Sequence, residues 1–368
     1  MQDLSPLFSS FEIKSVKLSN RFVMPSMQRG FAKDGVPTPE MAQYYRKRAE
    51  NGVSLVFGEG TAVVHPSATD YTDFALLTRP ALEGWKRVID EVKAADGNIF
   101  LQLWHQGGVR EEGKGLYPEA PTLSPSGLAL PGVANGREMT RRDLAEVRDA
   151  FVSGAEIAKS LEFDGVEVHS AHGYLLDQFL WDATNLRDDE YGGSLANRAR
   201  FPCEVVSGIR AVVGPDYPIS VRISQWKTRA WDAVNFESSD ELKLVLEMLV
   251  RAGADLFHAS TRRFWEPEFS GSDLGFAGWV KRLSSKPVIA VGSVGLDVDV
   301  MASLDGVEAG ATELRWLEEL VRRFSNDEFD LVAVGRAVLS DAEWVIKIRD
   351  GSFENLKPFN KEVLAFLD

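Results

Sequence analysis

Short runs of apolar residues recur along the chain, separated by segments in which apolar positions repeat with the period of a helix. Each run is rich in Val, Ile, Leu or Phe, as is typical of strands buried on both faces of a parallel sheet. The predicted strands cover residues 21–25, 53–59, 98–104, 165–169, 218–224, 255–260, 287–292 and 330–335.

The segments between these strands predict amphipathic helices, most clearly at 39–52, 81–97, 140–165 and 238–254. The first ends in a basic turn followed by Gly52, and the last begins at a Ser-Ser-Asp cap and closes at Gly253. Strands alternating with helices over roughly 330 residues predict an α/β protein with a (β/α)8 (TIM) barrel, in a single domain spanning 1–368. A doubly wound open sheet is the main alternative, and the absence of GxGxxG after the first strand counts against it.

Two segments depart from the alternation. Residues 11–20, FEIKSVKLSN, predict an N-terminal hairpin that could plug the N-terminal end of the barrel. Residues 105–139 form a long stretch rich in Gly and Pro after the third strand. Irregular segments of this length often carry function. This one would lie at the C-terminal mouth of the barrel, where active sites occur.

Composition excludes several classes of protein. The 368 residues are 44% apolar, which is ample for a packed core, and the formal charge of −14 disfavours binding to nucleic acid. No apolar run approaches the ~20 residues that span a bilayer, and the N-terminus lacks a signal-peptide pattern. The single cysteine, Cys203, is consistent with a reducing compartment, so we expect a cytoplasmic protein. We also expect a monomer or homodimer without membrane partners.

The chemistry is most concentrated in VEVHSAHGYLLDQF, residues 166–179, which places His169, His172 and Tyr174 within six positions. Side chains at the C-terminal ends of barrel strands meet at one site. The histidines could hold a metal ion, donate hydrogen bonds or be ordinary polar residues at a strand end. Few carboxylates follow the strands, which disfavours a glycosidase. Glu167 is expected to point into the barrel or to be paired within it.

Glycine follows each of the last two strands, at Gly292-Ser293 and at Gly335-Arg336. Glycine lets the backbone approach a ligand closely. The loops after strands seven and eight are the usual phosphate site of such barrels, and the guanidinium of Arg336 would suit an anion. Two ordinary tight turns are the alternative interpretation.

Six motifs carry a resemblance to a known family: NRFVMPSM at 20–27, FLQLWHQGG at 100–108, VEVHSAHGYLLDQFL at 166–180, NLRDDEYGGSLANRARF at 185–201, VRIS at 221–224 and VGRAVLSD at 334–341. Together they resemble the old yellow enzyme family of FMN-dependent oxidoreductases. They follow the family's order from about residue 5 to about residue 350, and the block from HGYLLDQFL to NRARF is the most specific. DDEYGGS within it is interpreted as a structural loop.

The resemblance implies a barrel that holds one non-covalent FMN, which NAD(P)H reduces and which then reduces an activated C=C bond in a ping-pong cycle. It implies that substrate is bound by His169, His172 and Trp104, and that Tyr174 donates the proton. Trp265, in a loop at 260–276 that matches no family pattern, is a further candidate for substrate binding or for packing. The residues matched to the FMN site are Pro25, Ser26, Gln28, Gly60, Gln102, Arg222, Gly292, Ser293, Gly335 and Arg336.

Elementary chemistry is consistent with these roles. Hydride addition to an alkene builds negative charge on the attached carbonyl or nitro oxygens, and two imidazole donors would stabilise that charge. A phenol, with an ordinary pKa near 10, stays protonated at neutral pH and can deliver a proton. Many relatives have Cys or Thr at the position of Gln28, so the resemblance does not predict the reduction potential of the flavin. The alternatives are a flavoenzyme acting on an amine or nitrate ester, a metal-dependent hydrolase built on the two histidines, and a non-enzymatic flavin carrier.

Overall fold

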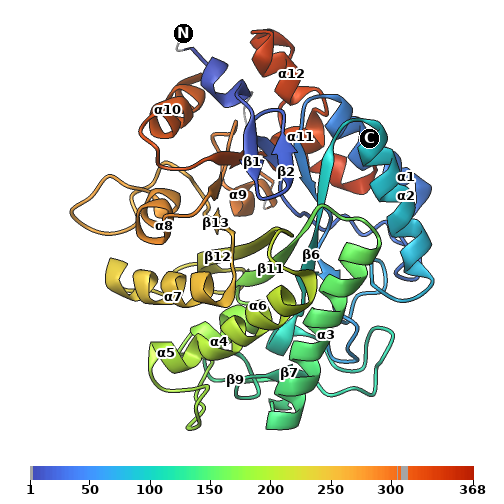
Figure 1. Ribbon diagram of the computed structural model, residues 1–368, viewed down its shortest axis with the longest axis vertical. Coiled ribbons are helices and arrows are strands. Elements are labelled where there is room, and N and C mark those ends of the chain that lie inside the picture. The colour runs from blue at the N-terminus through green and yellow to red at the C-terminus, as the bar shows by residue number, and fades with distance from the viewer. Residues whose placement is uncertain (1–2, 305, 308–313) are drawn as a thin grey trace.

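A closed ring of eight parallel strands forms the centre of the computed structural model, which describes residues 3–304, 306–307 and 314–368 (Figure 1). Neighbouring strands pair in chain order, and β15 pairs with β3 to close the ring. The strands are β3 (Phe22–Met24), β4 (Leu55–Phe57), β6 (Asn98–Trp104), β11 (Gly165–His172), β12 (Ile219–Lys227), β13 (Leu256–Ser260), β14 (Val288–Val291) and β15 (Leu331–Ala333). This ring confirms the predicted (β/α)8 barrel.

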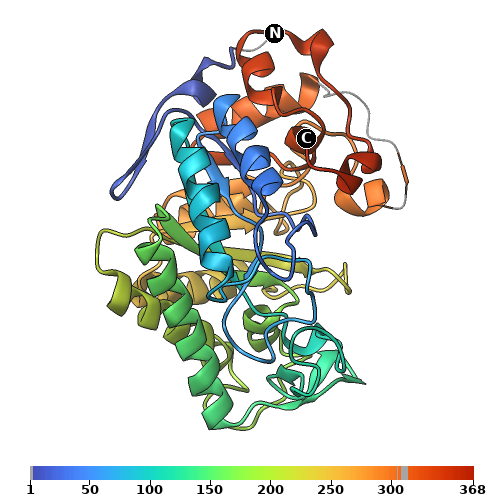
Figure 2. The same ribbon diagram turned by 90° about the vertical axis from the view of Figure 1, so that its right-hand side faces the viewer.

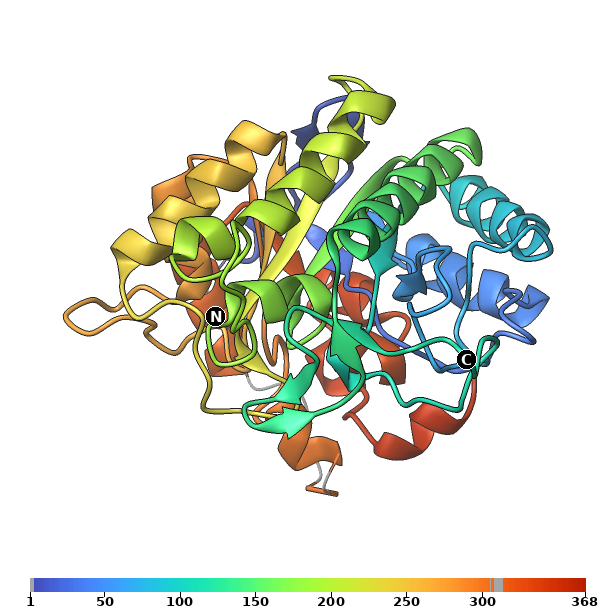
Figure 3. The same ribbon diagram turned by 90° about the horizontal axis from the view of Figure 1, so that it is seen from below.

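Helices cover the outside of the ring, as the view from below in Figure 3 shows. The four helices expected from the sequence are present as α1, α2, α3 and α7, each ending two to five residues before its predicted limit. Among the described residues, no helix combines the length and apolarity that crossing a membrane requires. The helices are α1 (Pro39–Glu50), α2 (Ala81–Ala94), α3 (Arg141–Ser160), α4 (Leu175–Leu180), α5 (Leu195–Arg198), α6 (Arg200–Val213), α7 (Ser239–Ala252), α8 (Phe276–Ser284), α9 (Val300–Leu304), α10 (Leu314–Ser325), α11 (Arg336–Ser340) and α12 (Trp344–Arg349). Short 3-10 turns occupy Ser5–Phe8, Gly107–Val109, Phe353–Asn355 and Lys361–Ala365.

The predicted N-terminal hairpin is formed by β1 (Phe11–Ile13) and β2 (Val16–Leu18), paired antiparallel. Its apolar side chains join one buried cluster with inward-facing barrel residues such as Leu55, Phe100 and Leu256. The side-chain amide of Asn98, the first residue of β6, donates to the carbonyl of Lys17 at 3.1 Å. The hairpin therefore closes the N-terminal end of the barrel, opposite the mouth.

The long stretch after β6 is more ordered than its composition predicts. It contains β7 (Leu123–Ser124) and β10 (Arg137–Glu138), which pair parallel, and β8 (Leu128–Leu130) and β9 (Val133–Ala134), which pair antiparallel. These strands form a small lobe at one end of the molecule (teal, Figure 2). A further short strand, β5 (Thr61–Ala62), pairs with the end of β6.

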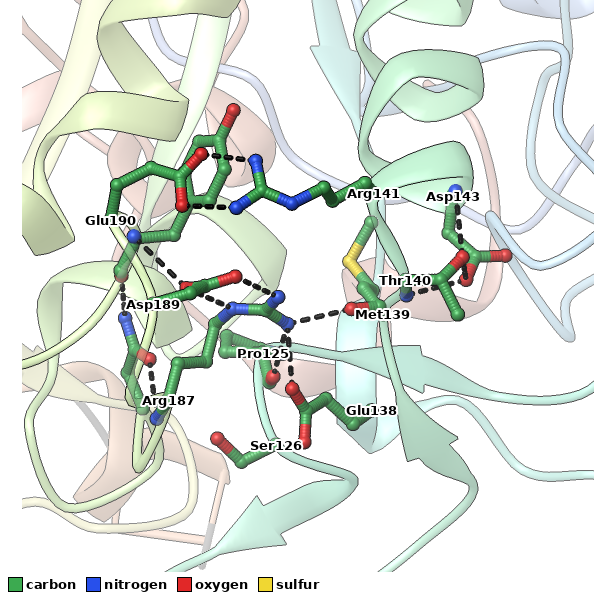
Figure 4. Close-up of polar contacts among 12 residues, drawn as sticks. Pro125, Ser126, Glu138, Met139, Thr140, Arg141, Asp143, Arg187, Asp189 and Glu190 are labelled. Carbon is green, nitrogen blue, oxygen red and sulfur yellow. Dashed lines mark hydrogen bonds and ion pairs between the residues drawn. The ribbon is translucent and has the colours of Figure 1, made fainter.

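Arg187 fastens this lobe to the loop that follows α4 (Figure 4). Its buried guanidinium donates to the carbonyl oxygens of Pro125 at 3.0 Å and Met139 at 2.6 Å, and it pairs with Asp189 at 2.6 Å. Arg141, the first residue of α3, pairs with Glu190 in the same loop. These contacts support a structural role for the DDEYGGS segment.

Candidate active site

The C-terminal ends of the strands surround a cavity of about 160 Å³, called the inner cavity below. All of its lining residues except Thr228 were predicted from the sequence. They are Ser26, Gln28, Gly60, Gln102, Trp104, His169, His172, Tyr174, Arg222 and Thr228. Residues more than two hundred positions apart in the chain thus meet at one site.

A second cavity of about 160 Å³, called the glycine cavity, adjoins the first and shares His172 and Arg222 with it. It contains the predicted Gly292, Ser293, Gly335 and Arg336.

Two predicted residues line neither cavity. Pro25 lies at the edge, because a Cβ placed on Gly335 would be 3.6 Å from its ring. Trp265 stacks on Trp316 with ring centroids 3.7 Å apart. The structure therefore places Trp265 in side-chain packing rather than beside the other candidates.

His172 owes its position to a local irregularity of β11. The register with β12 shifts between Ser170 and His172, and His172 itself has a φ of 64°, in the left-handed region. Its backbone N–H donates to Ser224 Oγ at 2.9 Å, and its carbonyl accepts from the backbone of Thr228 at 3.1 Å. Ser224 lies within β12, which continues to Lys227 rather than ending at 224 as predicted, and Thr228 is the first residue after that strand.

Both imidazoles are neutral hydrogen-bonding groups at physiological pH. Burial lowers the pKa of His169 to about 3, and the charge of Arg222 acts in the same direction. The same two causes lower the pKa of His172 well below its ordinary value. The Nδ1 atom of His169 accepts from the Ala171 N–H at 3.4 Å, which leaves Nε2–H as its donor. The Nε2 atom of His172 lies 2.8 Å from Ser260 Oγ.

Tyr174 follows the two histidines as the N-cap residue of α4. Its ring meets those of His169 and Trp104 edge to face, with centroids 5.1 Å and 5.2 Å away. Burial raises the pKa of its phenol to about 12. The hydroxyl is therefore fully protonated at neutral pH and can donate a proton into the inner cavity.

Gln102 is held from below by a buried carboxylate. Its amide Nε2 donates to Glu167 Oε1 at 2.8 Å, while Ser220 Oγ and His258 Nδ1 each contact Glu167 Oε2 at 2.9 Å. The strand register explains the meeting, because Glu167 lies opposite Gln102 on β6 and Ser220 on β12. Burial alone would raise the pKa of Glu167, but His258, Arg222 and Gln102 together lower it to about 2.

The guanidinium of Arg222 lies in the same layer of the barrel. It donates to the carbonyl of Ser26 at 3.3 Å and to Ser260 Oγ at 3.4 Å, and its buried Nε has no hydrogen-bond partner among the described residues. Within the described part of the chain, the buried Oε1 atom of Gln28 likewise has no hydrogen-bond partner, while its Nε2 donates to the Gly60 carbonyl at 2.9 Å. Unpaired buried polar atoms are costly, so their presence beside a cavity points to a polar ligand.

Glycine residues shape both cavities. A Cβ on Gly60 would come within 3.0 Å of Gln102 Oε1, and one on Gly292 within 2.4 Å of the Thr261 hydroxyl. Arg336 faces the glycine cavity and is held by Ser293 Oγ at 3.1 Å and the Val298 carbonyl at 2.7 Å. A flat ring with a polar edge fits the inner cavity, and a phosphate fits beside Arg336.

A metal site finds less support. Among the residues that the structure describes, no group of three or more His, Cys, Asp or Glu side chains could hold a metal ion. The two histidine rings are 5.1 Å apart and nearly perpendicular, and one of them is bonded to a serine. This donor set favours the flavin interpretation over the hydrolase.

Comparison with known proteins decides the family. The model of the NADH:flavin oxidoreductase / NADH oxidase family matches residues 6–308. The chain belongs to this family. Membership confirms the predicted old yellow enzyme relationship, and with it the flavin oxidoreductase class and non-covalent FMN with NAD(P)H as reductant. The residues that line the two cavities fit that cofactor: Gln102 and Arg222 would face the ring and Arg336 the phosphate.

The relatives differ in the fraction of their length that aligns with this chain. NADPH dehydrogenase from Bacillus licheniformis is 31% identical over 92% of both chains. NADH oxidase from Thermoanaerobacter brockii is 32% identical over 94% of this chain, which spans 51% of that protein's length. The rice protein 12-oxophytodienoate reductase 7 is 35% identical over 69% of this chain and 66% of its own.

Among solved structures, morphinone reductase bound to tetrahydroNAD superimposes with a TM-score of 0.81 at 26% identity, covering 97% of this chain and 93% of its own. The Old Yellow Enzyme from Pichia sp. reaches a TM-score of 0.82 at 26% identity, covering 98% and 90%.

Sequence reasoning missed several residues that support the site. Ser260 contacts both His172 and Arg222, and Trp226 lies with its ring 4.4 Å from that of His172. Lys227 is buried and pairs with Asp177 at 2.9 Å. Ser260 lies at the end of a predicted strand, and this position could have identified it as a site residue. Nothing in the local sequence around Lys227 indicates that this lysine is buried.

Proposed function

We propose that this protein is an NAD(P)H-dependent flavin oxidoreductase that reduces activated C=C bonds of α,β-unsaturated carbonyl or nitro compounds. The observation that carries the proposal is the inner cavity, where two neutral imidazoles and one protonated phenol face the same space. The names of its relatives, among them an NADPH dehydrogenase and a 12-oxophytodienoate reductase, support this class of reaction.

Bound FMN would supply the hydride, received from NAD(P)H and passed to the alkene in a second, separate half-reaction. His169 and His172 bind the carbonyl or nitro oxygen of the substrate through their ring N–H groups. They stabilise the negative charge that develops there, and no metal is needed for this. Because both rings are neutral, the interaction persists over the physiological pH range.

Tyr174 donates a proton to the α-carbon of the substrate. A raised pKa keeps the phenol protonated, and general acids of this kind typically contribute 10²–10⁴-fold in rate. Arg222 holds a permanent positive charge beside the cofactor site, and Gln102 orients the cofactor's polar edge. A pure flavin carrier would use Gln102 and Arg222 but gives Tyr174 no role.

The experiment that tests this function follows the visible spectrum of the FMN-loaded protein under nitrogen. Adding NADH or NADPH should bleach the flavin band, and adding cyclohexenone should restore it with formation of the saturated ketone. A protein that binds no FMN, or whose reduced form is reoxidised by oxygen but by no activated alkene, would contradict the proposal.

A further inference from the structure

A third cavity, called the side cavity, adjoins the inner cavity. It has a volume of about 120 Å³ and shares His172, Tyr174 and Thr228 with the inner cavity. A space of ~10–15 Å³ on this measure holds one water molecule, so the side cavity accommodates a ligand group of several heavy atoms. A substrate clasped by the histidines would extend into it past the proton donor.

The walls of the side cavity combine apolar surface with two cations. Ala129 and Leu130, from β8 of the lobe, and the exposed ring of Tyr71 form part of the wall. Lys227 and Arg229, which follow Arg222 along the same stretch of chain, also line the cavity. Among the described residues, no carboxylate lines this cavity.

The two cations differ in how they are neutralised. Lys227 pairs with the buried carboxylate of Asp177 at 2.9 Å and donates to the Gln225 carbonyl at 3.0 Å. Arg229 is exposed, and no hydrogen bond or ion pair of its guanidinium is found among the described residues. Its charge nevertheless reaches the site, since it opposes the rise in pKa that burial causes in Tyr71 and Tyr174. Among the described residues that line the side cavity, Arg229 is therefore the cation without an ion pair, while Asp70, which does not line the cavity, acts on the same two phenols in the opposite direction.

We infer that the preferred substrates are activated alkenes that carry an anionic group, such as a carboxylate, on an apolar chain, and that Arg229 binds this group. The inference rests on the proposed function and names its substrate class. The apolar chain would lie against Leu130 and Tyr71, and the reacting C=C bond would remain between the histidines and Tyr174. Asp70, the nearest acidic neighbour of Tyr71 along the chain, accepts the backbone N–H of Glu111 and does not line the cavity.

The test compares two substrates that differ only in charge: a cyclohexenone with a short carboxyalkyl chain and its methyl ester. With wild-type protein, kcat/KM for the acid should exceed that for the ester. Arg229→Gln should lower the value for the acid roughly tenfold and leave the ester within about twofold, because a charge-assisted hydrogen bond is lost. Arg229→Lys should retain part of the preference.

A matched control is Arg142→Gln, which removes the same charge from the exposed start of α3 and should change neither substrate. Raising the salt concentration should weaken use of the acid but not of the ester. Equal loss for both substrates in Arg229→Gln, or an unchanged ratio, overturns the inference while the proposed function stands. Failure of both substrates to reoxidise the reduced wild-type protein would instead overturn the proposed function.

Discussion

Replacing Glu167 with glutamine should destabilise the barrel and loosen its hold on the cofactor. The carboxylate accepts from Gln102, Ser220 and His258, and it is fully buried. An amide of the same shape has only one acceptor oxygen and brings two N–H groups. If these N–H groups faced Gln102, they would meet the N–H donor of its amide. Toward His258, the amide N–H groups would force the ring hydrogen onto Nε2, an atom for which the structure shows no hydrogen-bond partner among the residues it describes.

The size of the effect follows from the lowered pKa of Glu167, which is about 2 against an ordinary 4.5. At 1.36 kcal/mol for each pKa unit, the shift sets an upper limit of roughly 3 kcal/mol on the contribution of the ionised carboxylate at neutral pH, because part of the shift requires a charge on His258, and burial lowers the pKa of His258 so that its ring is neutral at pH 7. Because the folded-state pKa is depressed, this stability is present above about pH 4.5 and is lost as the pH falls toward 2. The substitution also leaves Arg222 without its buried counter-charge.

Urea unfolding at pH 7 should therefore show Glu167→Gln less stable than wild type by up to about 3 kcal/mol. The difference should begin to shrink below about pH 5. The exposed Glu156→Gln, on α3, serves as a control and should be neutral. Flavin binding should weaken as well, since Gln102 loses its anchor. Equal stability of Glu167→Gln and wild type at pH 7, or a difference that does not change with pH, would refute this account of the network.

Three further predictions concern single side chains. Tyr174→Phe should leave the reduction by NAD(P)H unchanged and slow alkene reduction roughly 10²–10⁴-fold in stopped-flow traces; equal slowing of both half-reactions would contradict its role. His172→Ala should weaken phenolate-like ligands roughly tenfold by spectral titration, and an unchanged Kd would remove His172 from the clamp. Arg187→Met, which leaves the carbonyls of Pro125 and Met139 unpaired, should cost about 3 kcal/mol in urea unfolding, and an unchanged midpoint would show that the lobe is held otherwise.

Hydrophobic patterning predicted the barrel because each buried parallel strand is apolar on both faces. The pattern placed the ends of β11 and β12 too early, because polar residues follow there although the chain remains in the sheet. Gln225 and Lys227 are buried, yet their partners, Phe236 and Asp177, are set by the fold rather than by local sequence. A buried lysine looks like a surface residue until its counter-charge, fifty positions earlier in the chain, is known.

Strand periodicity alone also does not predict that the two histidines face the same cavity. In a regular strand, residues three apart point to opposite faces, so His169 and His172 should not share a cavity. The register shift and the left-handed backbone of His172 turn both rings to one side, 5.1 Å apart. Such a conformation costs on the order of 1–2 kcal/mol for a residue with a Cβ, and it persists because Ser224 and Thr228 bind its backbone. Ser224 is the last residue of the predicted strand and Thr228 directly follows β12, so patterning located one of these two contacts, and the other depends on how the chain continues beyond Lys227.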